Sequence, residues 1–439
     1  MRDGGEARVP DPGTPSVTVV IPTHSRRPSL TRTLAGLSRQ SGPAETLPDT
    51  FEVVVVADGC TDDTVPFLAE SRWPFPLTVV EVDAGSAGVA RNRGAEAARG
   101  EILLFLDDDV EPGPQVVEGH RALHRDREEP ESRRGWVGLG PYLPVSRGKA
   151  DFYRMLVRAW WIEQFHAMSR EHHRFTYRDF LTGNVSLRRR DFLEAGGFDE
   201  RFRDCGGEDW ELGIRLLGSG LRFAYLPWAL SWHHDHETTD LDRSIQRARR
   251  EGIADGLIGE THRDLLPSLD LARLAHRGPA LWKLVPFTAL ALPRLGDPAS
   301  RLLRLLLPPL ESLRWRRWWR FVYGGLRWYG YWRGVGAALG GWKDLRRHLQ
   351  EPPTGRPPAE GLRTGEPRTG EGPAPGPPAR DAVRVSLGGR EVGLIPMGTG
   401  FEPLAGRHLP GILGEELRPG LLEALDTESF MAELREETL

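Results

Sequence analysis

Three carboxylates follow one another at Asp107, Asp108 and Asp109, directly after the apolar run ILLFL of residues 102–106. An uninterrupted apolar run of this length is typical of a strand that is buried on both faces of a parallel sheet. Like charges this close raise one another's pKa unless a cation lies among them. Clustered carboxylate oxygens suit Mg²⁺ or Mn²⁺, whereas a solvated acidic loop is the alternative for the triplet alone.

Two further groups of polar residues could take part in the same chemistry. Glu208 and Asp209 follow a Gly-Gly pair and begin a helical pattern, where acids also favour the positive end of the helix dipole. His233 and His234 belong to the run WHHDHE of residues 232–237. This run is either a polar surface loop or a metal site, because neutral imidazole is a common ligand.

The segments that must position these residues alternate between strand and helix patterns. Strands are predicted over residues 17–22, 51–58, 77–83 and 102–106, with helical patterns between them. This alternation predicts an α/β fold with a mostly parallel sheet flanked by helices, in which ligands bind beyond the carboxyl ends of the strands. Asp58 and the acidic triplet both follow such an end.

The composition describes a globular protein with one basic segment. The chain has 439 residues, of which 39% are hydrophobic, and a formal net charge of -4. Residues 301–350 carry eleven Lys or Arg but only two acids, Glu311 and Asp344. The acidic remainder opposes general binding to nucleic acid, so we expect a local anionic partner for the basic segment.

The cysteines and the apolar runs indicate the compartment. Cys60 and Cys205 are too few for a disulfide framework, and the polar first residues lack the apolar core of a signal peptide. No stretch reaches the roughly 18 apolar residues that a membrane-spanning helix needs. The sequence therefore predicts a cytoplasmic protein without a spanning helix.

Seven short motifs bear on the family of the chain. PTHSR, ADGCTDD, AGVARNRG, FLDDDV, TGNVSLRR, GGFDE and GGEDWELGIRL occur in this order. Together they resemble family 2 glycosyltransferases over roughly residues 16–240. GGEDWEL followed by a histidine is also similar to the carboxyl-terminal part of galactosyl- and N-acetylgalactosaminyltransferases. The resemblance implies the GT-A nucleotide-sugar-binding fold and a metal-dependent, inverting hexosyltransferase.

The resemblance also implies how the donor is bound. Thr23 and Asp58 match contacts to the nucleotide base, and Asp58 would accept the N3 proton of a uracil, which favours a UDP-sugar. Arg91 matches a position that contacts the base or the diphosphate, as a fixed cation would. Gly183 matches a position at which the donor sugar lies against the backbone.

A metal site is implied in the same way. Asp107 and Asp109 are the two acids of the family's Asp-any-Asp motif, with Asp108 between them beside the donor. Asp109 is the expected direct ligand of Mn²⁺ or Mg²⁺, which bridges to the diphosphate and stabilises its charge as it leaves. The family's metal-binding histidine falls on His233, with His234 as the alternative.

The second acid of the family's Glu-Asp motif is Asp209, which is expected to be the general base. The acceptor hydroxyl must lose its proton on the face opposite the departing diphosphate, so a carboxylate is needed there. Glu208 would contact donor or acceptor hydroxyls. Two other classes stay open: a sugar-phosphate nucleotidyltransferase, opposed by the lack of a Gly-rich, basic loop after the first strand, and a non-catalytic sugar-nucleotide-binding protein.

The domain organisation follows from these patterns. We expect a disordered N-terminus (1–15), a GT-A glycosyltransferase domain (16–240), a helical extension (241–350), a Pro/Gly-rich linker (351–380) and a small C-terminal module (381–439) with a hairpin around Gly388 and Gly389. Within the GT-A domain, the resemblance implies that residues 142–179 vary with the acceptor, which is a carbohydrate or a lipid-linked glycan.

The helical extension contains an unusual aromatic run. Residues 313–334 hold five tryptophans among their arginines. Trp prefers the headgroup region of a bilayer and Arg attracts anionic lipid, so we expect an interfacial helix. The predicted location is therefore peripheral, on the inner face of the cell membrane. The resemblance to glycosyltransferases implies a role in the synthesis of a cell-envelope polysaccharide.

Overall fold

The computed structural model describes residues 16–41, 51–126, 135–145, 151–203, 205–234, 240–271, 280–350, 382–387, 390–396, 399–412 and 417. The predicted disordered N-terminus and Pro/Gly-rich linker lie outside these residues. The chain divides into two compact units. Unit 1 comprises Met1–Phe165, Arg178–Leu212 and Ser219–Arg247, and unit 2 comprises His166–Tyr177, Gly213–Gly218 and Ala248–Leu439.

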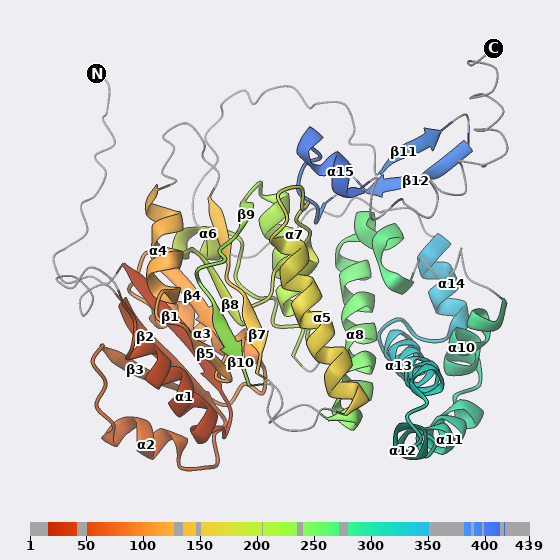
Figure 1. Cartoon of the computed structure of the whole chain (residues 1–439), viewed down its shortest axis with the longest axis horizontal. Coiled ribbons are helices and arrows are strands. Elements are labelled where there is room, and N and C mark those ends of the chain that lie inside the picture. The colour runs from red at the N-terminus through yellow and green to blue at the C-terminus, as the bar shows by residue number, and fades with distance from the viewer. Residues whose placement is uncertain are drawn as a thin grey trace. The chain divides into compact units, whose positions relative to one another are not determined.

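Unit 1 is built on a seven-stranded sheet in the order β3-β2-β1-β4-β8-β6-β9 (Figure 1). Its strands are β1 (Val17–Thr23), β2 (Phe51–Asp58), β3 (Leu77–Val82), β4 (Ile102–Leu106), β6 (Trp136–Leu139), β8 (Asn184–Arg188) and β9 (Arg222–Tyr225). Strands β1 to β4 are parallel, β8 runs antiparallel to both β4 and β6, and β6 pairs with β9 in parallel. The predicted mostly parallel sheet is confirmed.

Helices alternate with strands along this part of the chain. They are α1 (Arg27–Leu37), α2 (Thr64–Glu70), α3 (Ala87–Ala97), α4 (Val116–Asp126), α5 (Phe152–Met168), α6 (Arg189–Glu194), α7 (Glu208–Gly218) and α8 (Leu241–Thr261), with the short η1 (Tyr177–Asp179). Leu30, Leu34 and Leu37 of α1 are buried, as their spacing predicts. All five residues of β4 are buried too, as expected for a strand covered on both faces.

A small second sheet joins the acidic triplet to the histidine run. It contains β5 (Val110–Pro112), β10 (Ser231–His233) and β7 (Tyr142–Pro144), in the order β5-β10-β7. His233 pairs with Val110 across the antiparallel β10 and β5. Because Val110 follows Asp109 directly, this pairing brings the histidine beside the acids from a distant part of the sequence.

Strand β8 brings another distant segment to the same edge of the large sheet. Its antiparallel register pairs Asn184 with Leu106, the last residue of β4. The backbone N–H of Asp107 donates to the carbonyl oxygen of Gly183 at 3.4 Å. The start of β8 and the end of β4 therefore lie together.

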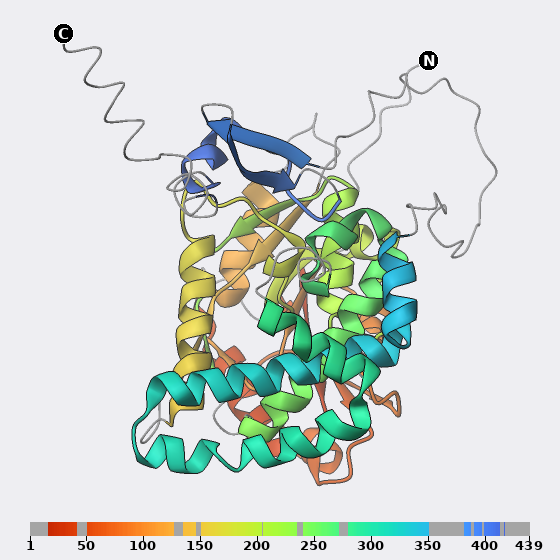
Figure 2. The same ribbon diagram turned by 90° about the vertical axis from the view of Figure 1, so that its right-hand side faces the viewer.

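Unit 2 contains most of the basic and aromatic extension (Figure 2). Besides part of α8, it has η3 (Arg263–Ser268), α10 (Ala280–Ala291), α11 (Pro293–Arg304), α12 (Leu307–Ser312), α13 (Arg316–Leu339), α14 (Trp342–Gln350), β11 (Ala382–Leu387), β12 (Arg390–Pro396), η4 (Gly406–His408) and α15 (Leu409–Gly411). Antiparallel pairing of β11 with β12 confirms the expected hairpin, although Gly388 and Gly389 lie outside the described residues. Within the described part of the chain, none of the helices combines the length and apolar character needed to cross a bilayer.

Close packing of α3 on the sheet yields the first test. A Cβ on Gly94 would lie 2.3 Å from Cγ1 of Val20 and 3.0 Å from Cγ2 of Val56. Gly94→Ala should therefore lower the free energy of unfolding by about 1–3 kcal/mol, because the sheet must shift to admit the methyl group. Urea denaturation would measure the change.

The matched control is Gly324→Ala in α13, where a Cβ would meet nothing within 4 Å. Both variants gain about 1 kcal/mol of helix propensity, so only packing separates them. Gly324→Ala should leave stability unchanged or raise it. Equal effects of the two changes would show that close packing against Val20 does not govern the cost at Gly94.

Candidate active site

The acidic triplet forms the turn between β4 and β5, and α1 holds its backbone. The hydroxyl of Thr33, which is fully buried, donates to the carbonyl oxygens of Asp108 at 2.9 Å and Val110 at 3.0 Å. The turn is thereby tied to the helix that follows β1. Its three carboxylates have different partners, which gives each a different electrostatic character.

Asp108 is buried, and its carboxylate accepts two side-chain hydrogen bonds. Its carboxylate accepts a hydrogen bond from the Thr23 hydroxyl at 2.7 Å and one from Nη1 of Arg26 at 2.6 Å. Burial raises the pKa of Asp108 to about 6, and Arg26 opposes this rise. Thr23, which is expected at the nucleotide base, thus donates its hydroxyl hydrogen bond to Asp108.

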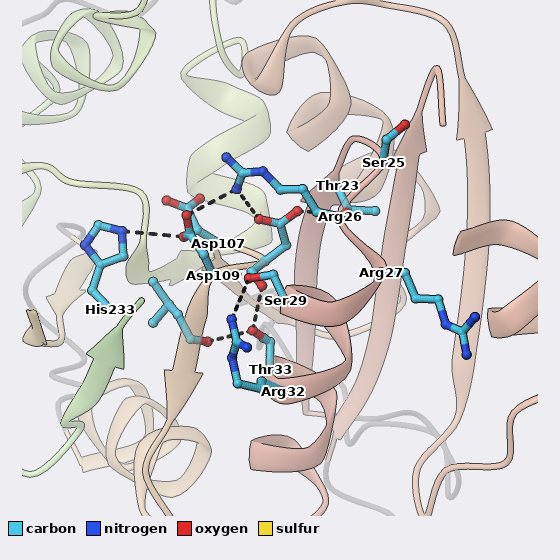
Figure 3. Close-up of polar contacts among 12 residues, drawn as sticks. Thr23, Ser25, Arg26, Arg27, Ser29, Arg32, Thr33, Asp107, Asp109 and His233 are labelled. Atoms are coloured by element: carbon cyan, nitrogen blue, oxygen red, sulfur yellow. Dashed lines mark hydrogen bonds and ion pairs between the residues drawn. The ribbon is translucent and has the colours of Figure 1, made fainter. Parts of the chain in front are cut away.

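Arg26 is the cation of the acidic turn. Its Nη1 also lies 3.1 Å from Oδ2 of Asp109, so a single guanidinium nitrogen contacts two carboxylates. Figure 3 shows Arg26 directed toward these acids and Arg27 directed away from them. The preceding Ser25 has a left-handed φ of 51°, and its hydroxyl accepts the backbone N–H of Thr61 at 2.9 Å.

Asp109 lies against His233. Nε2 of His233 is 3.5 Å from Oδ1 of Asp109 (Figure 3). Burial alone would raise the pKa of Asp109, but His233 and Arg26 hold it at about 2, so this carboxylate is ionised at neutral pH. His234 has a different partner, since its Nε2 lies 3.0 Å from Oε2 of Glu111. Of the two histidines, His233 is therefore the one beside the acidic motif.

Aromatic rings flank His233. Tyr142 and Trp161 each meet its imidazole edge to face, with ring centroids 5.4 Å apart in both pairs. Trp161 is buried in α5, whereas the adjacent Trp160 is 51% exposed.

Arg91 joins the two acidic motifs. Its Nη2 donates to Oδ1 of Asp107 at 2.7 Å, and its Nη1 donates to Oε1 of Glu208 at 3.2 Å. The guanidinium is almost fully buried and lies over the ring of Phe198. A buried cation between two carboxylates holds β4 and α7 at a defined separation.

Asp209 follows in the first turn of α7. One of its carboxylate oxygens accepts the backbone N–H of Trp210 at 2.8 Å. Burial and the neighbouring charge of Glu208 raise the pKa of Asp209 to about 7, and the charges of Arg91 and Arg247 oppose the rise. A carboxyl group that titrates near neutral pH can accept a proton at the operating pH of most enzymes.

Asp58 and Gly183 have structural partners that their sequence motifs do not reveal. The carboxylate of Asp58 accepts the backbone N–H groups of Ala84, Gly85 and Ser86 at 2.7–3.0 Å. It thereby closes the loop between β3 and α3. At Gly183, a Cβ would lie 2.7 Å from Cζ of Tyr142, so the aromatic ring by itself accounts for the glycine.

The donor set fits a divalent cation that also binds substrate oxygens. In the described parts of the chain, no group of three or more His, Cys, Asp or Glu side chains is arranged to hold a metal ion. Asp109 and His233 do lie together, while Asp107 is engaged by Arg91. Cations such as Mg²⁺ commonly bind one or two carboxylates and complete their shell with water and phosphate oxygens, which two protein ligands would allow.

Sequence reasoning missed the roles of Arg26, Tyr142 and Arg247. Arg26 stands within the quoted motif PTHSR, yet its partners are 82 and 83 residues away. A signal was available for Arg26 alone, because an arginine after the first strand of a parallel sheet lies at the edge where the acids emerge. Nothing in the local sequence marks Tyr142 or Arg247.

The chain is similar to a known protein family and to several of its members. A family model described as glycosyltransferase like family 2 matches residues 14–254. The validoxylamine A glucosyltransferase of Streptomyces hygroscopicus subsp. limoneus is 35% identical over 227 residues, which cover 47% of this chain and 49% of the relative. The uncharacterized glycosyltransferase YfnE of Bacillus subtilis (strain 168) is 26% identical over 262 residues, covering 50% and 64%. The match thus spans about half the length of the first relative.

A solved structure extends the comparison. The mannosyltransferase PcManGT from Pyrobaculum calidifontis, in complex with GDP-Man and Mn²⁺, is 20% identical with a TM-score of 0.45. The alignment covers 75% of this chain and 88% of the mannosyltransferase.

The position of Arg26 predicts that its replacement will lower the stability of the metal-free protein and raise the affinity for Mn²⁺. Arg26→Gln removes the cation between Asp108 and Asp109, so repulsion should lower stability without metal by on the order of 1 kcal/mol, discounted because the Arg26 side chain is 40% exposed. The same repulsion should strengthen Mn²⁺ binding. Thermal melting and isothermal titration calorimetry would measure the two effects.

Arg27→Gln is the matched control, because it makes the same charge change in the same turn. Arg27 pairs with the exposed Asp63 instead of the acidic turn, so neither measurement should change. Weaker Mn²⁺ binding by the Arg26 variant would contradict the argument, since Arg26 would then support the cation rather than compete with it.

Proposed function

The chain belongs to the family described as glycosyltransferase like family 2, and on that premise we propose that it is an inverting, metal-dependent hexosyltransferase. It is a glycosyltransferase with a GT-A fold, built on the mostly parallel sheet of unit 1. The proposed donor is a UDP-sugar, and the proposed acceptor is a hydroxyl group of a carbohydrate or lipid-linked glycan. Family membership argues against a nucleotidyltransferase and against a non-catalytic binding protein.

One observation carries the mechanism: Arg91 bonds both Asp107 and Glu208. The acidic turn and the start of α7 therefore belong to one site. The acidic turn supplies the ionised carboxylate of Asp109, which can bind a cation. The start of α7 supplies Asp209, whose carboxyl group has a pKa of about 7. A displacement at an anomeric carbon needs both functions, one at the leaving group and one at the nucleophile.

The donor nucleotide would bind beyond β1 and β2. A carboxylate offers about four acceptor positions, and the backbone of the β3–α3 loop uses three of those on Asp58. The remaining position can accept the N3 proton of uracil, which supports a UDP-sugar. Arg91 is fixed by its two carboxylates, and its charge would attract the diphosphate.

Asp109 and His233 are the proposed ligands of Mn²⁺ or Mg²⁺, with Asp107 as the second carboxylate of the motif. When bound, the cation would stabilise the negative charge of the departing diphosphate. Ionised Asp109 keeps a ligand oxygen available at neutral pH. Tyr142 and Trp161 orient the His233 ring and limit the access of water to it.

Asp209 is the proposed general base. Its raised pKa matches its basicity to neutral pH, where it can take the proton from the attacking hydroxyl. Glu208 would contact hydroxyl groups of donor or acceptor while held by Arg91. Residues 142–179 are proposed to select the acceptor, and the exposed Trp160 there offers a ring on which a sugar could stack.

The first test of this proposal is metal dependence. Chelation of divalent ions, or Asp109→Asn, should abolish transfer and weaken Mn²⁺ binding, because a charged ligand oxygen is lost. Nucleotide release from a panel of nucleotide sugars would measure activity and identify the donor. Asp63→Asn, at a 60% exposed side chain, is the control and should behave as the unmodified protein. Full activity in chelator would refute the metal requirement.

The second test concerns the base. Asp209→Asn keeps the shape of the side chain but not its basicity, so transfer should fall by about 10² to 10⁴-fold while donor and metal still bind. The rate of the unmodified enzyme should rise as pH increases through about 7, where Asp209 loses its proton. The variant's residual rate should lack that rise.

Asp191→Asn provides a matched control. Asp191 also lies in the first turn of a helix, and burial likewise raises its pKa. The Asp191→Asn variant should transfer sugar at a normal rate. Near-normal rates for Asp209→Asn, or retention of anomeric configuration in the product, would exclude Asp209 as an inverting base.

A further inference from the structure

The tryptophan-rich segment of unit 2 divides into a buried and an exposed part. Trp319, Tyr323, Leu326, Trp332 and Val335 of α13 are buried in unit 2. By contrast, Trp318 is 61% exposed and Phe321 is 58% exposed, near the amino-terminal end of the same helix. Of the nine aromatic residues between 313 and 334, four are buried (Trp319, Tyr323, Tyr331 and Trp332) and three are exposed (Trp315, Trp318 and Phe321). Only the exposed ones are available to a membrane, and the expected membrane contact stays a prediction.

Exposed apolar side chains continue from α13 to the end of α11 and to the residues on either side of α12. The exposed set consists of Leu302, Leu303, Leu305, Leu306, Leu313, Trp315, Trp318 and Phe321, each 46–68% exposed. We call it the α11–α13 surface. Both views show α11 and α12 beside α13 (Figures 1 and 2). Single exposed leucines are ordinary on a protein surface, but eight large apolar side chains within 20 residues mark an interaction site.

The charges around this surface identify the partner. Six exposed arginines share the stretch: Arg301, Arg304, Arg314, Arg316, Arg317 and Arg320. Glu311 is the single acid in the sequence between residues 301 and 321. A partner must therefore combine an apolar interior with a negatively charged rim.

We propose that the α11–α13 surface docks on an anionic lipid bilayer, with its leucines and aromatic rings in the interfacial region and its arginines at the phosphates. Leu and Trp gain by leaving water for the acyl boundary, and Arg gains from anionic headgroups. A second copy of the chain fits less well, because a symmetric contact would set six arginines against six. The proposal is independent of the transfer chemistry in unit 1.

Vesicle sedimentation with the full chain tests the proposal. Binding should be strong to vesicles of phosphatidylcholine with phosphatidylglycerol and weak to phosphatidylcholine alone. It should fall as salt rises from about 0.1 M to about 1 M, because the Debye length shortens from about 10 Å to about 3 Å. Equal binding to neutral vesicles at every salt concentration would overturn the role of the arginines.

Two substitutions examine the apolar part. Leu303→Glu combined with Trp318→Glu should reduce vesicle binding by about tenfold or more, because two inserted side chains become charged. The melting temperature should not change, since both side chains are exposed. Sugar transfer to a soluble acceptor should also persist, which separates this proposal from the proposed function.

Leu193→Glu combined with Trp228→Glu is the matched control. Leu193 is 46% exposed against 47% for Leu303, and Trp228 is 58% exposed against 61% for Trp318. The control should bind vesicles normally. Equal binding by both double variants would overturn the proposal. So would a chain that self-associates through Leu303 and Trp318 without binding vesicles, because the occupant would then be a second copy.

Discussion

Negative charge concentrated at one edge of the sheet is the constraint on which the rest of the site depends. The carboxylates concerned are Asp107, Asp108, Asp109, Glu208 and Asp209. Buried charges of one sign are tolerated only when cations or hydrogen bonds compensate them. Arg26 and Arg91 supply that compensation from β1–α1 and α3, so the crossover connections of the sheet also serve as its counter-ions.

The two arginines differ in what they permit. Arg91 is buried and shared between two motifs, so its charge is a fixed part of the scaffold. Arg26 is partly exposed, and its long side chain can move without disturbing the core. One compensating charge is therefore permanent and the other exchangeable.

The strands and motif order could be predicted from sequence because they rest on local patterns. The apolar run before Asp107 and the leucine spacing of α7 are examples. Partners were harder to predict, because they depend on pairings between distant segments: Thr23 bonds Asp108, and Tyr142 fills the space beside Gly183. The division of the tryptophan run into buried and exposed residues was hard to predict for a different reason. Its buried members Trp319, Tyr323 and Leu326 recur at helical spacing, which composition alone conceals.

The antiparallel direction of β8 has a consequence for diversification. The chain leaves the sheet after Leu139 in β6 and returns at Asn184 in β8, and Leu139 pairs with Val185. Departure and return thus occur at adjacent points on the same edge. An insertion anchored in this way can change in length and content while β6 and β8 keep their register. Chimeric enzymes that retain Tyr142, Trp161 and Gly183, which contact His233 and the backbone of Asp107, could therefore exchange the rest of this insertion.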